Sequence, residues 1–189
     1  MPRLKIEDLY RIKGEILRSS LLKSGKTTVR VTVHMGTCGI SSGADKILEI
    51  LNKEVESSGR KDIVITTSGC AGICNREPLI TVETAGQEPI KYAQVDAHKA
   101  RQIFHAHVLA GQVVSEWVFA CGWEQKEKNV DNTVSLGSEI ATSIHQLPFF
   151  KMQQLRVMRN RGLIQAEKME EYIACLLYTS DAADDDTIV

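Results

Sequence analysis

The chain has 189 residues, of which 43% are hydrophobic and 25% charged, and its formal net charge is −1. This balance is typical of a globular protein with one ordinary core and an appendage. The sequence has no stripe of basic residues that would indicate nucleic-acid binding, and no apolar run approaches the length of a membrane span. Residues 1–8 lack the apolar core of a signal peptide. We therefore expect a cytoplasmic protein, in which five cysteines are more often metal ligands or redox groups than disulfides.

The first half of the chain predicts a strand–helix–strand unit after an N-terminal helix in residues 1–25. Residues 29–33 alternate apolar and polar side chains, as a half-buried strand does. A helix follows, with apolar residues at positions 44, 47, 48, 51 and 55 and with Ser41 or Ser42 as its N-cap. Residues 62–67 form the second predicted strand.

Two further short strands and a helix complete the predicted domain. Residues 79–83 and 90–95 flank Ala85-Gly86 and predict a hairpin, and Asp96 is the expected cap of a helix that ends at Gly111. The order βαβ, ββ, α indicates an α/β fold with a mixed sheet, in a thioredoxin-like layout over residues 26–112. We expect one helix on each face of the sheet.

The remaining residues divide into three predicted segments. Residues 113–147 have no sustained periodicity and contain a charged run, 124–129, interpreted as solvated, so that they are expected to be a linker. Residues 148–174 begin a new unit with a basic helix over 151–160 and a second short helix. Residues 175–189 are either a disordered acidic tail or translated sequencing-adapter sequence. The second interpretation is favoured, and the chain would then be truncated.

Three cysteines follow the two parallel strands, Cys38 after the first and Cys70 and Cys74 after the second. Both loops lie at the carboxyl edge of a βαβ sheet, so the thiols are expected to converge. Soft thiolates favour iron–sulfur or zinc over hard ions. Glycines near the cysteines allow close backbone approach and N–H donation to sulfur: Gly36, Gly39, Gly69 and Gly72.

A [2Fe–2S] cluster needs four ligands, and His34, four residues before Cys38, is the candidate for the fourth because imidazole can replace thiolate on one iron. Other interpretations remain open: a redox dithiol formed by Cys70 and Cys74, a zinc site, or a cluster-free docking domain. Cys121, in the predicted linker, and Cys175 are expected to have no part in the site.

The cysteine loop and the helix start carry a family resemblance. Gly43-Ala44 and Cys70-x-x-x-Cys74 resemble the thioredoxin-like [2Fe–2S] ferredoxin domain, the fold of the 24 kDa-type subunit of respiratory NADH dehydrogenase. The first cysteine pair of that family is not reproduced here. His34 stands at the position of the family's first cysteine, and Cys38 lies one residue before the position of its second cysteine. Residues 33–44 look instead like a variant at the front of fused flavin subunits of NADP-reducing hydrogenases, including electron-bifurcating ones.

Residues 148–151, 155–164 and 170–173 are similar to the start of the 51 kDa-type flavin subunit, whose FMN, NAD(P)H and [4Fe–4S] sites come later. The resemblance implies an electron-transfer module of an NAD(P)-linked hydrogenase, or alternatively of an NADH:quinone oxidoreductase, with the other subunits of that complex as partners. Cys38, Cys70, Cys74 and His34 would hold the cluster. No catalytic residue is expected, and the fragment alone would not oxidise NAD(P)H.

Overall fold

The computed structural model describes residues 28–124 and 142–156 continuously, with Asp8, Arg11, Ser135–Leu136, Glu139–Ile140 and residues 158, 160, 161, 169 and 173. Most of the predicted N-terminal helix, the second helix of the C-terminal unit and the tail lie outside the described residues. Within the described part, no helix is both long enough and apolar enough to cross a membrane.

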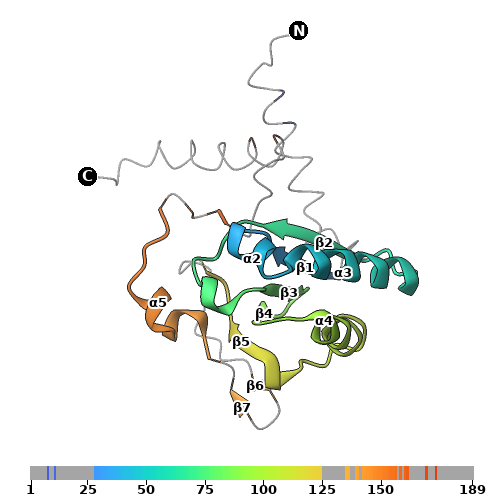
Figure 1. Ribbon diagram of the computed structural model, residues 1–189. Helices are drawn as coiled ribbons and strands as arrows, with labels where there is room; N and C mark the ends of the chain where they lie inside the picture. The colour runs from blue at the N-terminus through green and yellow to red at the C-terminus, as the bar shows by residue number, and fades with distance from the viewer. Residues whose placement is uncertain are drawn as a thin grey trace.

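A five-stranded mixed sheet with the order β2-β1-β3-β4-β5 forms the centre of the molecule (Figure 1). β1 pairs in parallel with β2, and the other neighbours are antiparallel. The order along the chain confirms the predicted α/β class and the βαβ-ββα layout of a thioredoxin-like ferredoxin. The strands are β1 (Val29–His34), β2 (Ile63–Ser68), β3 (Ile80–Thr84), β4 (Ile90–Tyr92) and β5 (Val118–Cys121), and β6 (Ser135–Leu136) pairs separately with β7 (Glu139–Ile140).

The helices are α2 (Thr37–Ser41), α3 (Ala44–Ser58), α4 (Ala97–Ile103), which continues as a π-helical stretch over Phe104–Leu109, and α5 (Pro148–Lys151). The expected Ser41 or Ser42 cap of α3 is wrong. Gly43, in the left-handed region with φ of +98°, precedes α3, and the Ser42 hydroxyl donates instead to the Cys38 carbonyl at 2.7 Å. Asp96 is confirmed as the cap of α4, because its carboxylate accepts the Lys99 N–H at 2.8 Å.

Both α3 and α4 pack on the same face of the sheet, so the expectation of one helix on each face is wrong. Side chains of α3, α4 and the π-helical stretch share one core with alternate residues of the strands. On the strands these are Val29, Val31, Val33, Ile63, Ile80, Val82, Ile90 and Tyr92. Continuous apolar burial on one face is what holds the two helices side by side.

The opposite face of the sheet is polar and yet buried. The buried residues on this face include Thr32, His34, Thr66, Thr81, Glu83 and Lys91, each at most 8% exposed. Glu124 is buried as well, so the interpretation of 124–129 as solvated is wrong at its first residue. A smaller apolar cluster lies beside the cysteine loop and includes Ala71, Ile73, Leu79, Ala120, Ile144 and Phe150.

The segment expected to be a linker contributes an edge strand. β5 pairs with β4, with a register irregularity between Lys91 and Tyr92. β5 has only four residues, too few to show the alternation of apolar and polar side chains that marks a strand. It becomes a strand because it pairs with the edge of β4, which lies far away in the sequence. The predicted helix over 151–160 also differs, since α5 ends at Lys151 through a turn in which Gln153 N–H donates to Phe150 O at 3.2 Å.

Candidate metal centre

The three predicted cysteine ligands meet at the carboxyl edge of the parallel strands. Cys38 lies in α2, directly after β1, and Cys70 and Cys74 lie after β2. The Sγ atoms of Cys70 and Cys74 are 4.0 Å apart, and the Cys74 thiol also has a hydrogen-bond interaction with Cys38. Cys38 and Cys74 are exposed, whereas Cys70 is half-buried. The thiols are therefore gathered at an accessible edge.

The sulfur spacing fits two ligands of one metal. Tetrahedral metal–thiolate bonds of about 2.3 Å hold two sulfurs roughly 3.8 Å apart, close to the 4.0 Å between Cys70 and Cys74. The pKa of the Cys74 thiol is raised, mainly by its hydrogen bond with Cys38 and against an opposing hydrogen bond from Cys70. Crowded thiols resist ionisation, and a soft metal cation would relieve that resistance by binding the thiolates.

Glycine backbone lets the two cysteine loops touch. A Cβ on Gly36 would lie 2.7 Å from the Cys70 Cβ, closer than side-chain atoms pack. Gly72, with φ of +83°, donates its N–H to Cys70 Sγ over 3.2 Å. The Phe149 ring lies against Gly72, because a Cβ there would lie 2.9 Å from Phe149 Cζ. The sulfur of Cys70 thus has a backbone donor that a thiolate requires.

His34, the predicted fourth ligand, lies below the cysteine loop and is 2% exposed. Its Nε2 is 2.9 Å from Thr81 Oγ1, and its Nδ1 is 3.4 Å from the carbonyl of Gly69, the residue before Cys70. Burial, with the nearby charge of Lys91, lowers the pKa of His34 to about 3, so the ring is neutral. The structure brings the three cysteines together and leaves His34 bound to protein atoms.

In the described conformation, no three His, Cys, Asp or Glu side chains of the described residues are gathered tightly enough to enclose a metal ion. The thiols nevertheless fit a thiolate-bound group, by the spacing of Cys70 and Cys74 and by the Gly72 donor. Cys121 is separate from them: it is buried in β5, and its thiol donates to Thr142 O at 3.6 Å.

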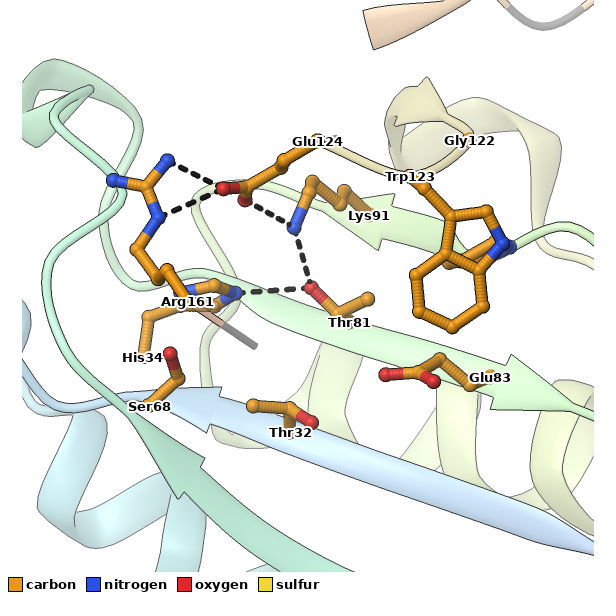
Figure 2. Close-up of a pocket in the computed structure, with 11 residues that line it drawn as sticks. Thr32, His34, Ser68, Thr81, Glu83, Lys91, Gly122, Trp123, Glu124 and Arg161 are labelled. Atoms are coloured by element: carbon orange, nitrogen blue, oxygen red, sulfur yellow. Dashed lines mark hydrogen bonds and ion pairs between the residues drawn. The ribbon is translucent and has the colours of Figure 1, made fainter. Parts of the chain in front are cut away.

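A buried chain of polar side chains runs from His34 to Arg161 (Figure 2). Thr81 Oγ1 contacts both His34 Nε2 and Lys91 Nζ, the latter at 3.0 Å. Lys91 Nζ lies 2.9 Å from Glu124 Oε1, and Arg161 Nε donates to Glu124 Oε2 at 2.7 Å. The chain ends where Arg161 Nη1 donates to the carbonyl oxygen of Cys70 at 3.0 Å.

The charges in this chain are all nearly removed from water. The side chains of Lys91, Glu124 and Arg161 are 6%, 7% and 8% exposed. Burial by itself would raise the pKa of Glu124, but Lys91 and Arg161 together hold that pKa below its ordinary value. Glu124 is therefore ionised, and the three residues carry one net positive charge. A cavity of about 30 Å³ beside them is large enough to hold a water molecule.

Sequence reasoning missed Lys91, Glu124 and Arg161. Lys91 sits between two apolar strand residues, the ordinary pattern of a solvent-facing side chain, and Glu124 opens a charged run. Arg161 lies 37 residues beyond Glu124 and 91 beyond Cys70. No local signal joins them, because their contacts link β4 and the cysteine loop to two residues that follow β5 in the chain.

No protein-family model matches the chain. It is 30% identical over 108 residues to the NADP-reducing hydrogenase subunit HndB of Solidesulfovibrio fructosivorans, over 57% of this chain and 84% of that protein. It is 28% identical over 82 residues to a 2Fe-2S ferredoxin of Clostridium pasteurianum, over 43% of this chain and 76% of that one.

Among solved structures, a thioredoxin-like [2Fe–2S] ferredoxin from Aquifex aeolicus matches with a TM-score of 0.46 and 19% identity, over 51% of this chain and 94% of its own. The sequence match to HndB has 30% identity and covers 84% of that protein, which indicates common descent. The chain belongs to the family of the NADP-reducing hydrogenase subunit HndB.

Proposed function

We propose that this chain is an electron-transfer module that holds a [2Fe–2S] cluster through Cys38, Cys70 and Cys74. The observation that carries the proposal is the 4.0 Å separation of the Cys70 and Cys74 sulfurs at an exposed edge, with Cys38 in hydrogen-bond interaction with Cys74. An exposed edge suits a one-electron carrier because a redox partner can approach it. The 2Fe-2S ferredoxin of Clostridium pasteurianum among the relatives supports the same chemistry.

The cluster, when bound, supplies a reversible one-electron centre, and the chain supplies its ligands and their surroundings. The three thiols bind as thiolates, which requires each to lose its proton. Gly72 N–H donates to Cys70 Sγ at 3.2 Å, and such donors favour the more negative, reduced state of an iron–sulfur centre. The buried positive charge of Lys91 and Arg161, only partly balanced by Glu124, acts in the same direction.

The fourth ligand in this proposal is His34. Its ring is neutral, the form that binds metals, and Nδ1 is the nitrogen that faces the cysteine loop through Gly69 O. Ligation through Nδ1 would replace the 3.4 Å contact with that carbonyl and place the ring proton on Nε2, which would then donate to Thr81 Oγ1. A hydrogen bond from the second ring nitrogen is the usual support of a histidine ligand.

The whole protein is proposed to be part of a cytoplasmic NADP-reducing hydrogenase of the electron-bifurcating type, with other subunits of that complex as partners. The family relationship to HndB, a subunit of an NADP-reducing hydrogenase, supports this assignment. Residues 148–174 are proposed as the start of a 51 kDa-type flavin-subunit domain, which in the whole subunit would bring FMN, NAD(P) and a [4Fe–4S] site. An NADH:quinone oxidoreductase subunit is the alternative assembly.

The test is anaerobic reconstitution with iron and sulfide, followed by metal analysis and a visible spectrum, on the parent and on Cys38→Ala, Cys70→Ala and His34→Ala. About two irons and two sulfides per chain are expected for the parent, with loss in both cysteine variants and an altered charge-transfer band in His34→Ala. Cys121→Ala is the matched control and should keep the cluster. A colourless protein with zinc, with a Cys70–Cys74 disulfide, or with neither would overturn the electron-transfer role in favour of a zinc, dithiol or docking protein.

A further inference from the structure

The Arg161 guanidinium connects two groups that are distant in sequence. Its Nε and Nη2 donate to Glu124 Oε2, and its Nη1 donates to the carbonyl oxygen of Cys70 at 3.0 Å. The side chain is 8% exposed. One planar fork therefore joins a buried carboxylate to the backbone of the loop that carries two of the three gathered cysteines.

The anchor of this fork is itself fixed. Glu124 Oε1 lies 2.9 Å from Lys91 Nζ, and Lys91 donates to Thr81 Oγ1 at 3.0 Å, so the carboxylate is held against β3 and β4. Figure 2 shows Glu124 between Lys91 and Arg161, with both cations directed at its oxygens. A planar guanidinium that is bound to a fixed carboxylate has little rotational freedom. The direction in which Nη1 donates is therefore fixed as well.

We propose that Arg161 is a positioning residue for the cysteine site. By holding the Cys70 carbonyl it fixes the loop of residues 69–74 against the sheet, and with it the Cys70 and Cys74 thiols. The same segment places the Phe149 ring on Gly72, within that loop. Residues that follow the sheet in sequence thus set the geometry of a site whose ligands all precede them. The inference rests on the proposed function only for the identity of the group that the loop holds.

Arg161→Lys is the decisive variant. Lysine keeps the positive charge and the ion pair with Glu124, but a single ammonium group does not reproduce the fork that also reaches Cys70. In the metal-free full chain, amide hydrogen exchange in residues 69–75 is expected to be roughly five- to tenfold faster than in the parent, the loss of about one hydrogen bond. Exchange in β1 and β3 should be unchanged.

Arg60→Lys is the matched control, because Arg60 also pairs with a carboxylate, its Nε donating to Asp62 Oδ1 at 2.9 Å, but at the opposite end of β2. It should leave exchange in residues 69–75 as in the parent. Arg161→Gln is the second variant, which removes both contacts and should accelerate loop exchange at least as much. After reconstitution, the g-values of the reduced cluster should shift in both Arg161 variants and not in Arg60→Lys.

Parent-like loop exchange with parent-like g-values in both Arg161 variants would overturn the proposal. Faster exchange over the whole sheet in both would also overturn it, because Arg161 would then be a general stabiliser. If no variant and no parent binds a cluster, the proposed function fails while loop exchange in the metal-free protein still decides the role of Arg161. If the cluster binds and only the Arg161 effect is missing, the positioning role alone fails.

Discussion

The Tyr92 hydroxyl and His107 Nδ1 form a hydrogen bond of 2.9 Å in the apolar core, with the two rings edge to face. The hydroxyl also accepts the Val114 N–H at 3.3 Å, so it joins the imidazole to the backbone of the segment that follows the π-helical stretch. His107 is 1% exposed and lies in the π-helical stretch after α4. This stretch is thereby tied to β4 by a hydrogen bond to an imidazole that burial keeps neutral.

Stability should fall in acid because of His107. Burial lowers its pKa to about 4, below the ordinary value of 6.5, so the unfolded chain binds a proton first as the pH falls. The stabilisation is fully present above about pH 6.5 and is lost as the pH falls towards 4, amounting to ~2 kcal/mol between about pH 8 and pH 5. His34, whose pKa is also lowered by burial, adds a loss of the same sign.

The measurement is urea unfolding of the parent and of His107→Gln at about pH 8 and pH 5. Glutamine can form a hydrogen bond with the Tyr92 hydroxyl and does not titrate. The free energy of unfolding that the variant loses between the two pH values should therefore be smaller than the loss in the parent by ~2 kcal/mol. The residual loss in the variant reports His34. Equal acid losses in the two proteins would show that His107 does not titrate as its burial requires.

Glu124→Gln should destabilise the fold strongly. The substitution leaves Lys91 and Arg161 buried with no carboxylate between them, and removing one partner of a buried ion pair typically costs about 3 kcal/mol or more. Glu54→Gln is the control, since Glu54 pairs with the half-exposed Arg101 at 3.4 Å and should change the free energy of unfolding by less than about 1 kcal/mol. Similar losses in the two variants, measured in urea at neutral pH, would contradict a buried network.

The sequence was sufficient for the parts of the fold that depend on local pattern. The alternation in β1 and the apolar spacing of α3 place Val31, Val33 and Leu51 in the core, where they are fully buried. Asp96 could be identified as a cap because its side chain serves a backbone N–H only three residues away. Cys38, Cys70 and Cys74 could be grouped because parallel strands end at the same edge of a sheet.

What the sequence could not reveal depends on contacts between distant residues. β5 has four residues and becomes a strand only through pairing with β4. Glu124 resembles the start of a solvated run and is buried only because Lys91 and Arg161 neutralise it. The prediction of a Ser42 cap was wrong for a local reason. α2 ends directly before Ser42, and the Ser42 hydroxyl donates back to the Cys38 carbonyl of that helix.

Gly36→Ala should damage the cysteine site by steric overlap. Gly36 has φ of −67°, which any residue adopts, so the backbone tolerates alanine. The new Cβ would, however, lie 2.7 Å from the Cβ and 3.0 Å from the Cα of Cys70, atoms that move only with the loop. Overpacking of this kind typically costs about 1–3 kcal/mol. We expect a lower urea midpoint and less iron bound after reconstitution, because Cys38 and Cys70 are forced apart.

Gly69→Ala is the matched control on the facing loop. A Cβ at Gly69 would meet no atom within 4 Å, and the φ of Gly69 is outside the left-handed region, so alanine should be tolerated. Alanine should even stabilise the fold by up to about 1 kcal/mol, because it lowers the conformational entropy of the unfolded chain. Iron content should equal that of the parent. Full iron loading in Gly36→Ala would mean that the two loops need not touch for the thiols to act together. Equal iron loss in both alanine variants would mean that the glycines matter for backbone freedom rather than for the approach of Gly36 to Cys70.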